Sequence, residues 1–499
     1  MIELTGRGRI GDVVALADRT DRVLVSPRVV EAVARAHELA DDLCTRHPTY
    51  GRTTGVGANK TIAVEPHTPD HGMRLLRSHA VDAGDRLPDR QVRAMLAVRL
   101  IQLCVPGGGL DPSILNGLAH MLNEDSLPLI RQHSSIGTGD LAALAGTALT
   151  LIGERPATKP LTPMPAWGAD SALPFMSSSA LTIGRSCLAV AELSRLDRAA
   201  SLIYLLSFSA LAGNPSAFSR VAARASAAGQ VPEIAARLRF LLADGGTDTH
   251  EPARIQDPYG LRVYPIAQGA VLAALSSLAA QLESTLNTAQ ENPLFDFDGD
   301  EVIHHGAFYQ ASLALTLDAT TLALAAAAPL THSRIRLLNE PETTGHNAFL
   351  ADDTPGSSGL MVVEYVAAGA IAEMRNAAQP ASLGTLVLSR GAEEDATFAS
   401  QGALQLERSI AAYRILLCCE LVGALRLLRR QRRTDTLRGI LGAAIETAAH
   451  LPDDDRDRDL RDDLAAAETI LDDLGNLVPD YGLTTQPALD QRSATVVSK

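Results

Sequence analysis

The segment Gln401–Arg433 reads QGALQLERSIAAYRILLCCELVGALRLLRRQRR. Its apolar residues recur at three- and four-residue intervals, the spacing of an α-helix that is buried on most sides. The same composition is found in Pro265–Asn287, Gln310–Pro329 and Met361–Ala378. Each run is roughly 18–33 residues long, well above the mean helix of about 11–12 residues. We therefore predict an all-α protein with a central bundle of long helices, buried by one another and by neighbouring subunits.

The overall composition narrows the class of protein. The 499 residues are 46% hydrophobic and 20% charged, as in globular domains. The net charge of −14 argues against a nucleic-acid partner and against an anionic membrane surface. Aromatic residues make up only 4%, while Ala and Leu are abundant, which favours helix over sheet.

The cysteines and the apolar segments indicate the cellular compartment in which we expect the protein. The five cysteines show no metal-ligand spacing, so we expect no metal site and buried thiols in a reducing cytoplasm. They are Cys44, Cys104, Cys187, Cys418 and Cys419. The first residues, MIELTGRGRIGDVV, lack a secretory signal pattern. The most apolar stretch, Leu313–Leu330, contains Asp318 and Pro329 and is expected to be a buried helix, not a membrane span.

The most informative motif is Gln132–Leu144, which reads QHSSIGTGDLAAL. It resembles the segment of histidine and phenylalanine ammonia-lyases in which an Ala-Ser-Gly triplet precedes Asp-Leu-Ala. In that family the triplet cyclises and loses water, giving an electrophilic methylidene-imidazolone group. Here the triplet is Gly137-Thr138-Gly139. The resemblance therefore implies a methylidene-imidazolone-type group, made from threonine instead of serine.

Two further segments of the N-terminal half resemble the same family. Tyr50–Gly57 (YGRTTGVG) resembles Tyr-Gly-x-Asn-Thr-Gly-Phe-Gly. The resemblance implies that Tyr50 is the catalytic base on a loop that closes over the substrate, and the glycines permit such closure. Leu75–Ala80 (LLRSHA) matches the Ser-His of histidine lyases. His79 is thereby implied to hold the substrate side chain.

The most specific match is Ile255–Arg262, which reads IQDPYGLR and resembles Gln-Asp-x-Tyr-Ser-x-Arg. The resemblance implies that Gln256 and Arg262 bind the substrate, with Arg262 on its carboxylate. A planar guanidinium can grip a carboxylate through two hydrogen bonds and so orient an amino acid. Tyr259 is implied to lie near the prosthetic group and to act in catalysis. Only Gly260, in place of serine, departs from the pattern.

Later elements follow in the family's order. Glu291–Leu294 (ENPL), Gly306–Tyr309 (GAFY), Gly356–Met361 (GSSGLM) and Glu393–Ala396 (EEDA) each resemble a family segment. By resemblance, Phe308 lies beside the prosthetic group and Glu394 faces the substrate amine. The ordered matches run from Tyr50 to Phe398 and identify the chain as a member of this family.

Two departures affect the chemistry. Thr138 keeps the β-hydroxyl that must be eliminated, but its product would be an ethylidene with a methyl on the carbon to be attacked, a bulkier and poorer electrophile. The family also has an Ile-Asn-Gly-Thr segment whose amide supports the group. Its best match here is Phe175–Ser178, which places Met176 at the asparagine and in the substrate-binding set. A thioether cannot supply the donors of an amide, although Ser177 or Ser178 could substitute in part.

The resemblance implies a lyase or aminomutase that acts on an amino acid or close analogue by removing a β-proton and eliminating the amine. We divide the chain into residues 1–195, which carry the Tyr50 loop and the triplet, and residues 196–499, which form the bundle. The resemblance implies a homotetramer whose sites draw on several subunits. Two alternatives stay open: a member with an uncyclised triplet that runs another elimination, addition or cyclisation in a specialised pathway, and a catalytically silent homologue.

Overall fold

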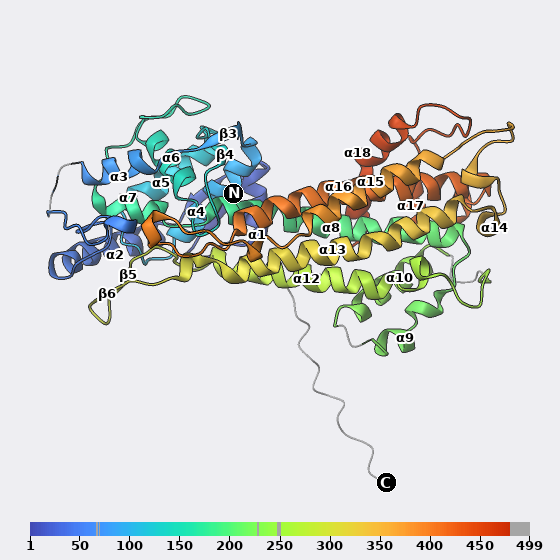
Figure 1. Ribbon diagram of the computed structural model, residues 1–499, viewed down its shortest axis with the longest axis horizontal. Helices are drawn as coiled ribbons and strands as arrows, with labels where there is room; N and C mark the ends of the chain where they lie inside the picture. The colour runs from blue at the N-terminus through green and yellow to red at the C-terminus, as the bar shows by residue number, and fades with distance from the viewer. Residues whose placement is uncertain (66–67, 69, 227–228, 247–250, 480–499) are drawn as a thin grey trace, which may run out of the picture.

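The computed structural model describes residues 1–65, 68, 70–226, 229–246 and 251–479, and this part of the chain is mainly helical. Figure 1 shows an N-terminal lobe on the left, joined to long helices that extend to the right. The lobe contains α1 (Ile10–Ala17), α2 (Pro27–Arg46), α3 (His71–His79), α4 (Asp89–Leu103), α5 (Ser113–Asn123), α6 (Leu141–Leu151) and α7 (Ala169–Met176). The predicted all-α class is confirmed.

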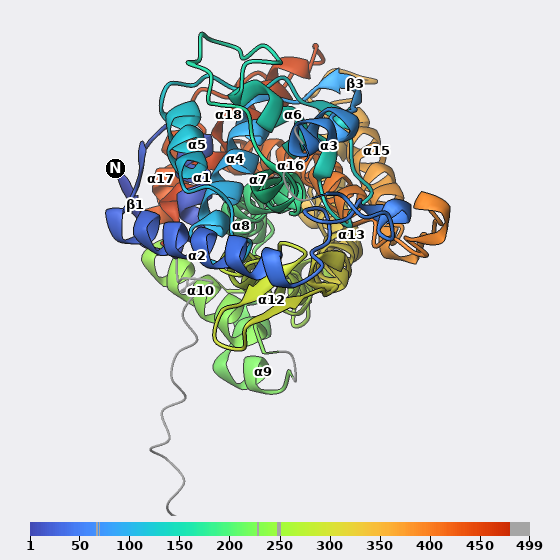
Figure 2. The same ribbon diagram turned by 90° about the vertical axis from the view of Figure 1, so that its left-hand side faces the viewer.

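Five long helices form the bundle: α8 (Ala180–Ala210), α12 (Tyr264–Leu286), α13 (Ala311–Asn339), α15 (Met361–Ala377) and α16 (Ala399–Arg430). Helix α16 packs along α13, α8 and α15. Viewed end-on in Figure 2, α16 and α8 lie near the middle of the molecule. Helix α16 contributes many buried residues between Leu406 and Leu428, as the spacing of apolar residues in Gln401–Arg433 predicts.

Shorter elements surround this bundle. The remaining helices are α9 (Arg220–Arg224), α10 (Val231–Asp244), α11 (Tyr259–Arg262), α14 (Pro341–Thr344), α17 (Gly439–Thr447) and α18 (Arg461–Leu477). The strands form three two-stranded sheets. They are β1 (Ile2–Leu4) parallel to β2 (Val23–Val25), β3 (Ala83–Arg86) antiparallel to β4 (Arg131–His133), and β5 (Leu294–Asp296) antiparallel to β6 (Glu301–Ile303).

One predicted boundary is wrong. The run Gln310–Pro329 was expected to end at its proline, but α13 continues through Pro329 to Asn339. A proline inside a helix removes one backbone hydrogen bond and crowds the preceding turn. Packing of α13 on α12, α15 and α16 compensates for this local defect, and the additional turns carry Arg334 into the core.

The division at residue 195 falls inside α8, which runs unbroken from Ala180 to Ala210. Its first half packs on α4 of the N-terminal lobe, and the helix as a whole packs on α16. One continuous core of buried side chains runs from the lobe into the bundle. Helix α8 therefore belongs to both halves of the chain.

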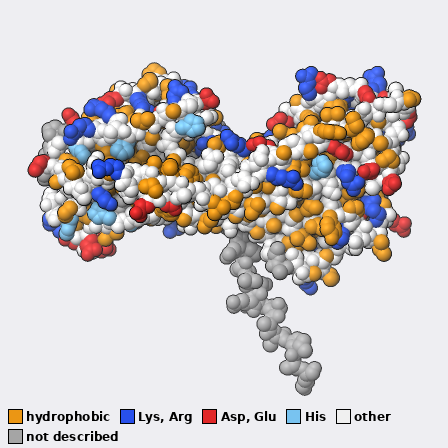
Figure 3. Space-filling view, viewed as in Figure 1, with side chains coloured by type: hydrophobic (Ala, Val, Ile, Leu, Met, Phe, Trp, Pro, Cys, Tyr) orange, Lys and Arg blue, Asp and Glu red, His pale blue; other side chains and the backbone are white. Residues whose placement is uncertain are grey.

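The long helices leave apolar side chains in solvent. Those more than half exposed on α12, α13 and α15 are Ile266, Leu315, Leu322, Val362 and Tyr365. Figure 3 shows apolar side chains spread over the surface of the bundle half. By length and composition α12 and α13 could cross a membrane, but about half of each apolar window is buried within the protein, as in core helices.

Candidate active site

The Gly137-Thr138-Gly139 triplet lies against the start of α16. Gly137 has φ of +100° and Gly139 has φ of +139°, conformations that favour glycine. A Cβ at Gly137 would lie 2.4 Å from the backbone nitrogen of Ala399. The Phe398 N–H donates to the carbonyl of Ile136 at 3.0 Å. The triplet is therefore pressed onto the N-terminus of a long helix, and glycine is the residue that permits this contact.

Three helices begin around the triplet. Helix α6 starts directly after Asp140, α8 starts two residues after Ser178, and α16 starts at Ala399. The Asp140 N–H donates to the Ser178 carbonyl at 2.7 Å. The Asp140 carboxylate accepts from the backbone N–H and the hydroxyl of Thr182 at 2.8 and 3.1 Å. Helix N-termini carry partial positive charge, so three such ends face the region of the triplet, together with the Asp140 carboxylate.

Asp140 is completely buried, and burial raises the pKa of its carboxyl group, opposed by the hydrogen bonds that it accepts from Thr182. Ser135, which lies in the same turn, binds both ends of the triplet. Its hydroxyl donates to the Gly139 carbonyl at 3.1 Å and accepts from the Gly137 N–H at 3.2 Å. Ser135 was not among the residues predicted from the sequence. Its position two residues before the first glycine, in a Ser- and Gly-rich turn, is the available signal.

Three hydroxyl groups beside the triplet have no hydrogen-bond partner within the described part of the chain: those of Ser134, Ser179 and Thr397. The Thr397 hydroxyl lies 3.0 Å from the point where a Cβ on Gly137 would be. Buried hydroxyls without partners are costly. Their concentration here indicates a polar setting suited to a group with additional hydrogen-bond acceptors.

A buried ion pair supports the segment Phe175–Ser178. We call this segment the wall behind the triplet, because its Ser178 carbonyl accepts from the N–H of Asp140. The Arg99 Nη2 lies 2.8 Å from the Glu291 Oε1, and both side chains are inaccessible to solvent. Arg99 also donates to the carbonyls of Phe175 and Pro174 at 2.9 and 2.5 Å. These contacts fix the end of α7, where Met176 is fully buried in the core. The structure thus places Met176 inside this wall.

Tyr50 lies in the loop that follows α2. The Gly57 N–H donates to its phenolic oxygen at 2.6 Å. Burial raises the pKa of Tyr50, the Gly57 hydrogen bond opposes this shift, and the charge of Glu393 adds to it. The same loop meets the segment before α16, since the Ala58 N–H donates to the Ser389 hydroxyl at 3.1 Å. Within one chain the phenol is therefore held neutral.

Three other predicted site residues, His79, Phe308 and Glu394, are partly or fully exposed. His79 ends α3, and its Nδ1 lies 2.8 Å from the Leu75 carbonyl and 3.1 Å from the Ser78 hydroxyl. Phe308 is half-buried in a short 3-10 turn, and Glu394 is exposed. The Tyr309 hydroxyl donates to the Asp395 carboxylate at 2.6 Å. This bond, which the sequence analysis missed, joins the Phe308 turn to the Glu394 segment.

Gln256, Tyr259 and Arg262 lie in the α11 region, at the other end of the bundle. Gln256 and Tyr259 are exposed, and the Arg262 guanidinium lies over the Tyr259 ring at 4.5 Å. Helix α11 is bonded through Arg334 to Glu420, whereas the triplet contacts Ala399. Those two α16 residues are separated by about six helical turns, or about 30 Å. One chain does not bring the two sets of predicted residues together.

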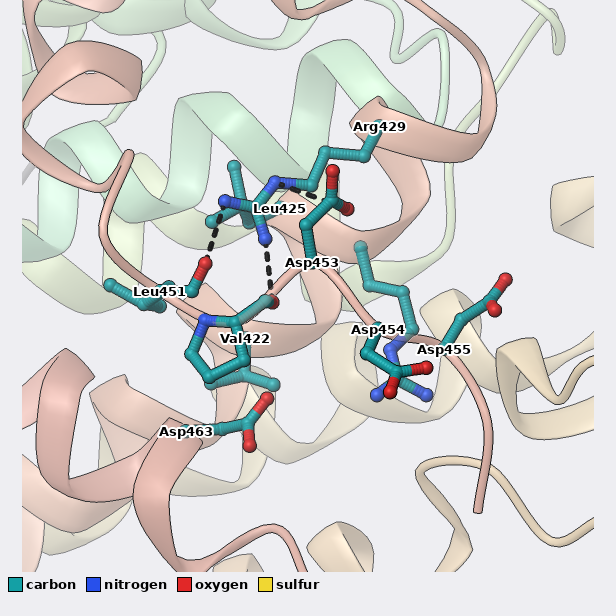
Figure 4. Close-up of a pocket in the computed structure, with 10 residues that line it drawn as sticks. Val422, Leu425, Arg429, Leu451, Asp453, Asp454, Asp455 and Asp463 are labelled. Atoms are coloured by element: carbon teal, nitrogen blue, oxygen red, sulfur yellow. Dashed lines mark hydrogen bonds and ion pairs between the residues drawn. The ribbon is translucent and has the colours of Figure 1, made fainter. Parts of the chain in front are cut away.

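A small pocket lies near the C-terminal end of α16, away from the triplet, which contacts the N-terminal end (Figure 4). It is lined by Leu425, Arg426 and Asp463 among others, and its volume is about 20 Å³. That is room for about one water molecule. Arg429 closes it by donating to the carbonyls of Leu451 and Pro452. Across the described residues there is no cluster of three or more His, Cys, Asp or Glu that could hold a metal ion.

Comparison with known proteins gives a consistent result. The family model for aromatic amino acid lyases matches residues 9–450. The histidine ammonia-lyase of Symbiobacterium thermophilum is 31% identical over 479 residues, covering 91% of this chain and 93% of that protein. The histidine ammonia-lyase of Streptomyces coelicolor is 30% identical, covering 95% and 97%.

Solved structures share the fold. A tyrosine aminomutase from Streptomyces globisporus superposes with a TM-score of 0.89 at 24% identity, covering 95% of this chain and 97% of that one. A histidine ammonia-lyase from Trypanosoma cruzi superposes with a TM-score of 0.87 at 22% identity, covering 99% of each chain. At these identities the likeness concerns the fold alone.

Proposed function

The chain belongs to the aromatic amino acid lyase family and is an enzyme of the ammonia-lyase type, and on this premise we propose that it eliminates an amine from an amino acid or close analogue. The substrate carries a carboxylate that Arg262 binds. The histidine ammonia-lyases among its relatives make histidine the first substrate to test. The Ser78-His79 pair supports this order of testing.

One observation carries the proposal: the two halves of the site lie about 30 Å apart on one chain. An amino acid cannot span that distance. We therefore propose that a second copy brings its Tyr259 and Arg262 to the Thr138 end of the first, within a homotetramer. The exposed apolar side chains along α12, α13 and α15 supply a surface for such an interface.

The residues then have separate tasks. Arg262 binds the carboxylate, and its Nε is buried with no partner among the described residues. Tyr50 accepts the β-proton, and a cation from the second copy would lower its pKa toward a useful range. Glu394 faces the amine and His79 the side chain, while Phe308 packs beside them.

The residues around the triplet fit a Thr138-derived imidazolone. Thr138 supplies the β-hydroxyl, and its partial exposure leaves room for the additional methyl of an ethylidene. Gly139 favours the tight approach of its nitrogen to the Gly137 carbonyl. Ser134, Ser179 and Thr397 supply free hydroxyls. The group, when formed, provides an electrophile that makes the amine a better leaving group.

A second candidate is a lyase that keeps the triplet linear. The two hydrogen bonds of Ser135 to Gly137 and Gly139 favour it, because they stabilise the open turn. Such an enzyme would keep Tyr50 and Arg262 but need a substrate whose leaving group requires no activation. Met176, which offers no amide in the wall behind the triplet, is consistent with either candidate.

The test is a screen of amino acids for ultraviolet-absorbing acrylate products. We expect at least one aromatic or imidazole amino acid to give such a product, and the variant Arg262→Gln to raise KM strongly. Arg28→Gln, on the exposed surface of α2, is the charge-matched control. If no amino acid in the panel yields an acrylate or an isomerised amino acid, the proposed function is wrong.

A further inference from the structure

The backbone of α11 is held from inside the bundle. Arg334 on α13 donates through Nη1 to the carbonyl of Gly260 at 3.0 Å. Tyr204 on α8 donates through its hydroxyl to the carbonyl of Leu261 at 2.9 Å. Both donors are completely buried. The two residues that lie between Tyr259 and Arg262 are thus each bonded to a core side chain.

Arg334 is itself fixed by a buried carboxylate. Its Nε and Nη2 lie 2.6 and 2.7 Å from the two oxygens of Glu420 on α16. The Ser207 hydroxyl donates to Glu420 at 2.8 Å, and Arg334 also donates to the Thr331 hydroxyl at 3.0 Å. A two-pronged guanidinium–carboxylate pair holds both partners in one geometry. Three long helices therefore meet at a rigid point directly beneath α11.

Aromatic rings complete this support. The rings of Tyr204 and Tyr264 stack at 4.0 Å with an interplanar angle of 7°. The Arg334 guanidinium lies 5.3 and 5.2 Å from their centres. Burying a charged pair costs desolvation energy that a packed apolar core would not incur. The buried Arg334–Glu420 pair, which is bonded to the α11 backbone, is suited to fixing α11 in one position.

Gly260 brings α11 into reach of these donors. A Cβ at this position would lie 2.9 Å from the Ser333 hydroxyl and 3.2 Å from the Leu330 carbonyl. The backbone of α11 therefore packs directly onto α13. A serine at this position would bring its Cβ against the Ser333 side chain, which would have to shift.

Arg262, in contrast, has no support of its own. Within the residues that the structure describes, no carboxylate pairs with its guanidinium, which lies over the ring of the exposed Tyr259. Its direction is therefore set by the backbone from which it extends. Resting on the proposed function of Arg262, we propose that Arg334, Glu420 and Tyr204 are positioning residues. By holding the backbone of α11 from the core, they orient the guanidinium that binds the carboxylate.

The test measures carboxylate selectivity in the assembled protein. The probes are 3-(imidazol-4-yl)acrylate and 3-phenylacrylate, each paired with its carboxamide, and equilibrium binding gives the ratio of the two affinities. Tyr204→Phe removes one hydroxyl and keeps the ring. We expect it to lower the acrylate-to-amide ratio by roughly two- to tenfold, the usual effect of one hydrogen bond. Thr150→Val, which removes a buried hydroxyl that donates to the Gly146 carbonyl within α6, should leave the ratio unchanged.

A second variant removes the pair without leaving a buried charge alone. Arg334→Met combined with Glu420→Gln keeps similar volumes and should lower the ratio at least as much as Tyr204→Phe. If Arg262→Gln abolishes the preference for acrylate while Tyr204→Phe and the double variant keep it, the positioning role is wrong and the proposed function stands. If the wild-type protein shows no preference for acrylate, both are wrong.

Discussion

Replacing Gly137 with alanine gives the triplet its family residue at that position, yet the structure predicts that Gly137→Ala destabilises the protein. The new Cβ would lie 2.4 Å from the backbone nitrogen of Ala399, and the backbone has φ of +100°. Strain at such a φ costs about 1–2 kcal/mol. Overpacking against backbone that cannot rotate away costs about 1–3 kcal/mol more.

We therefore expect Gly137→Ala to lose about 2–5 kcal/mol of unfolding free energy, a large share of a typical total of about 5–15 kcal/mol. Gly391→Ala is the matched control, because Gly391 has φ of +84° but nothing within 4 Å of its Cβ position. It should lose only the strain, about 1–2 kcal/mol. Urea denaturation at one protomer concentration measures both. Equal losses in the two variants would refute the close contact with α16.

Three further predictions concern the chemistry of the site. The intact mass of the wild-type chain should be lower than the sequence mass by two water molecules, and Thr138→Ala should not show this loss; an unmodified wild-type mass would favour the linear-triplet candidate. Tyr50→Phe should abolish turnover while keeping the unfolding free energy within about 1 kcal/mol of wild type. Burial raises the pKa of Tyr50 within one chain and the cation of the second copy opposes this shift, so the wild-type rate should rise with pH as the phenol ionises and then level off, between about pH 5 and pH 10. A flat profile over that range would exclude Tyr50 as the base.

The sequence predicted the long helices well because their apolar spacing depends on local periodicity. Gln401–Arg433 and Met361–Ala378 correspond closely to α16 and α15. The end of α13 was missed, since the cost of Pro329 is local while the packing that outweighs it comes from α12 and α16. Local rules cannot weigh contacts between segments that are far apart in the chain.

At the candidate site, too, short local motifs could be predicted from the sequence, whereas contacts between distant residues could not. Motifs identified Tyr50, the triplet and Arg262 as candidates, because each lies in a short segment of recognisable pattern. The Arg334–Glu420 and Arg99–Glu291 pairs were not identified, since each joins residues more than 80 positions apart. Nor could spacing along the chain reveal that Arg262 and Thr138 lie at opposite ends of one bundle.

Subunit complementation tests most directly whether the site is shared between two copies. Tyr50→Phe and Arg262→Gln chains are co-expressed with different tags and purified through both, and activity is assayed at a substrate concentration near the wild-type KM, at which each pure variant oligomer should turn over little or no substrate. If Tyr50 and Arg262 of one site come from different chains, about a quarter of the sites in random hybrids contain both intact residues. Activity should then return to about that fraction of wild type. Hybrids that form but stay as inactive as their parents would contradict the shared site.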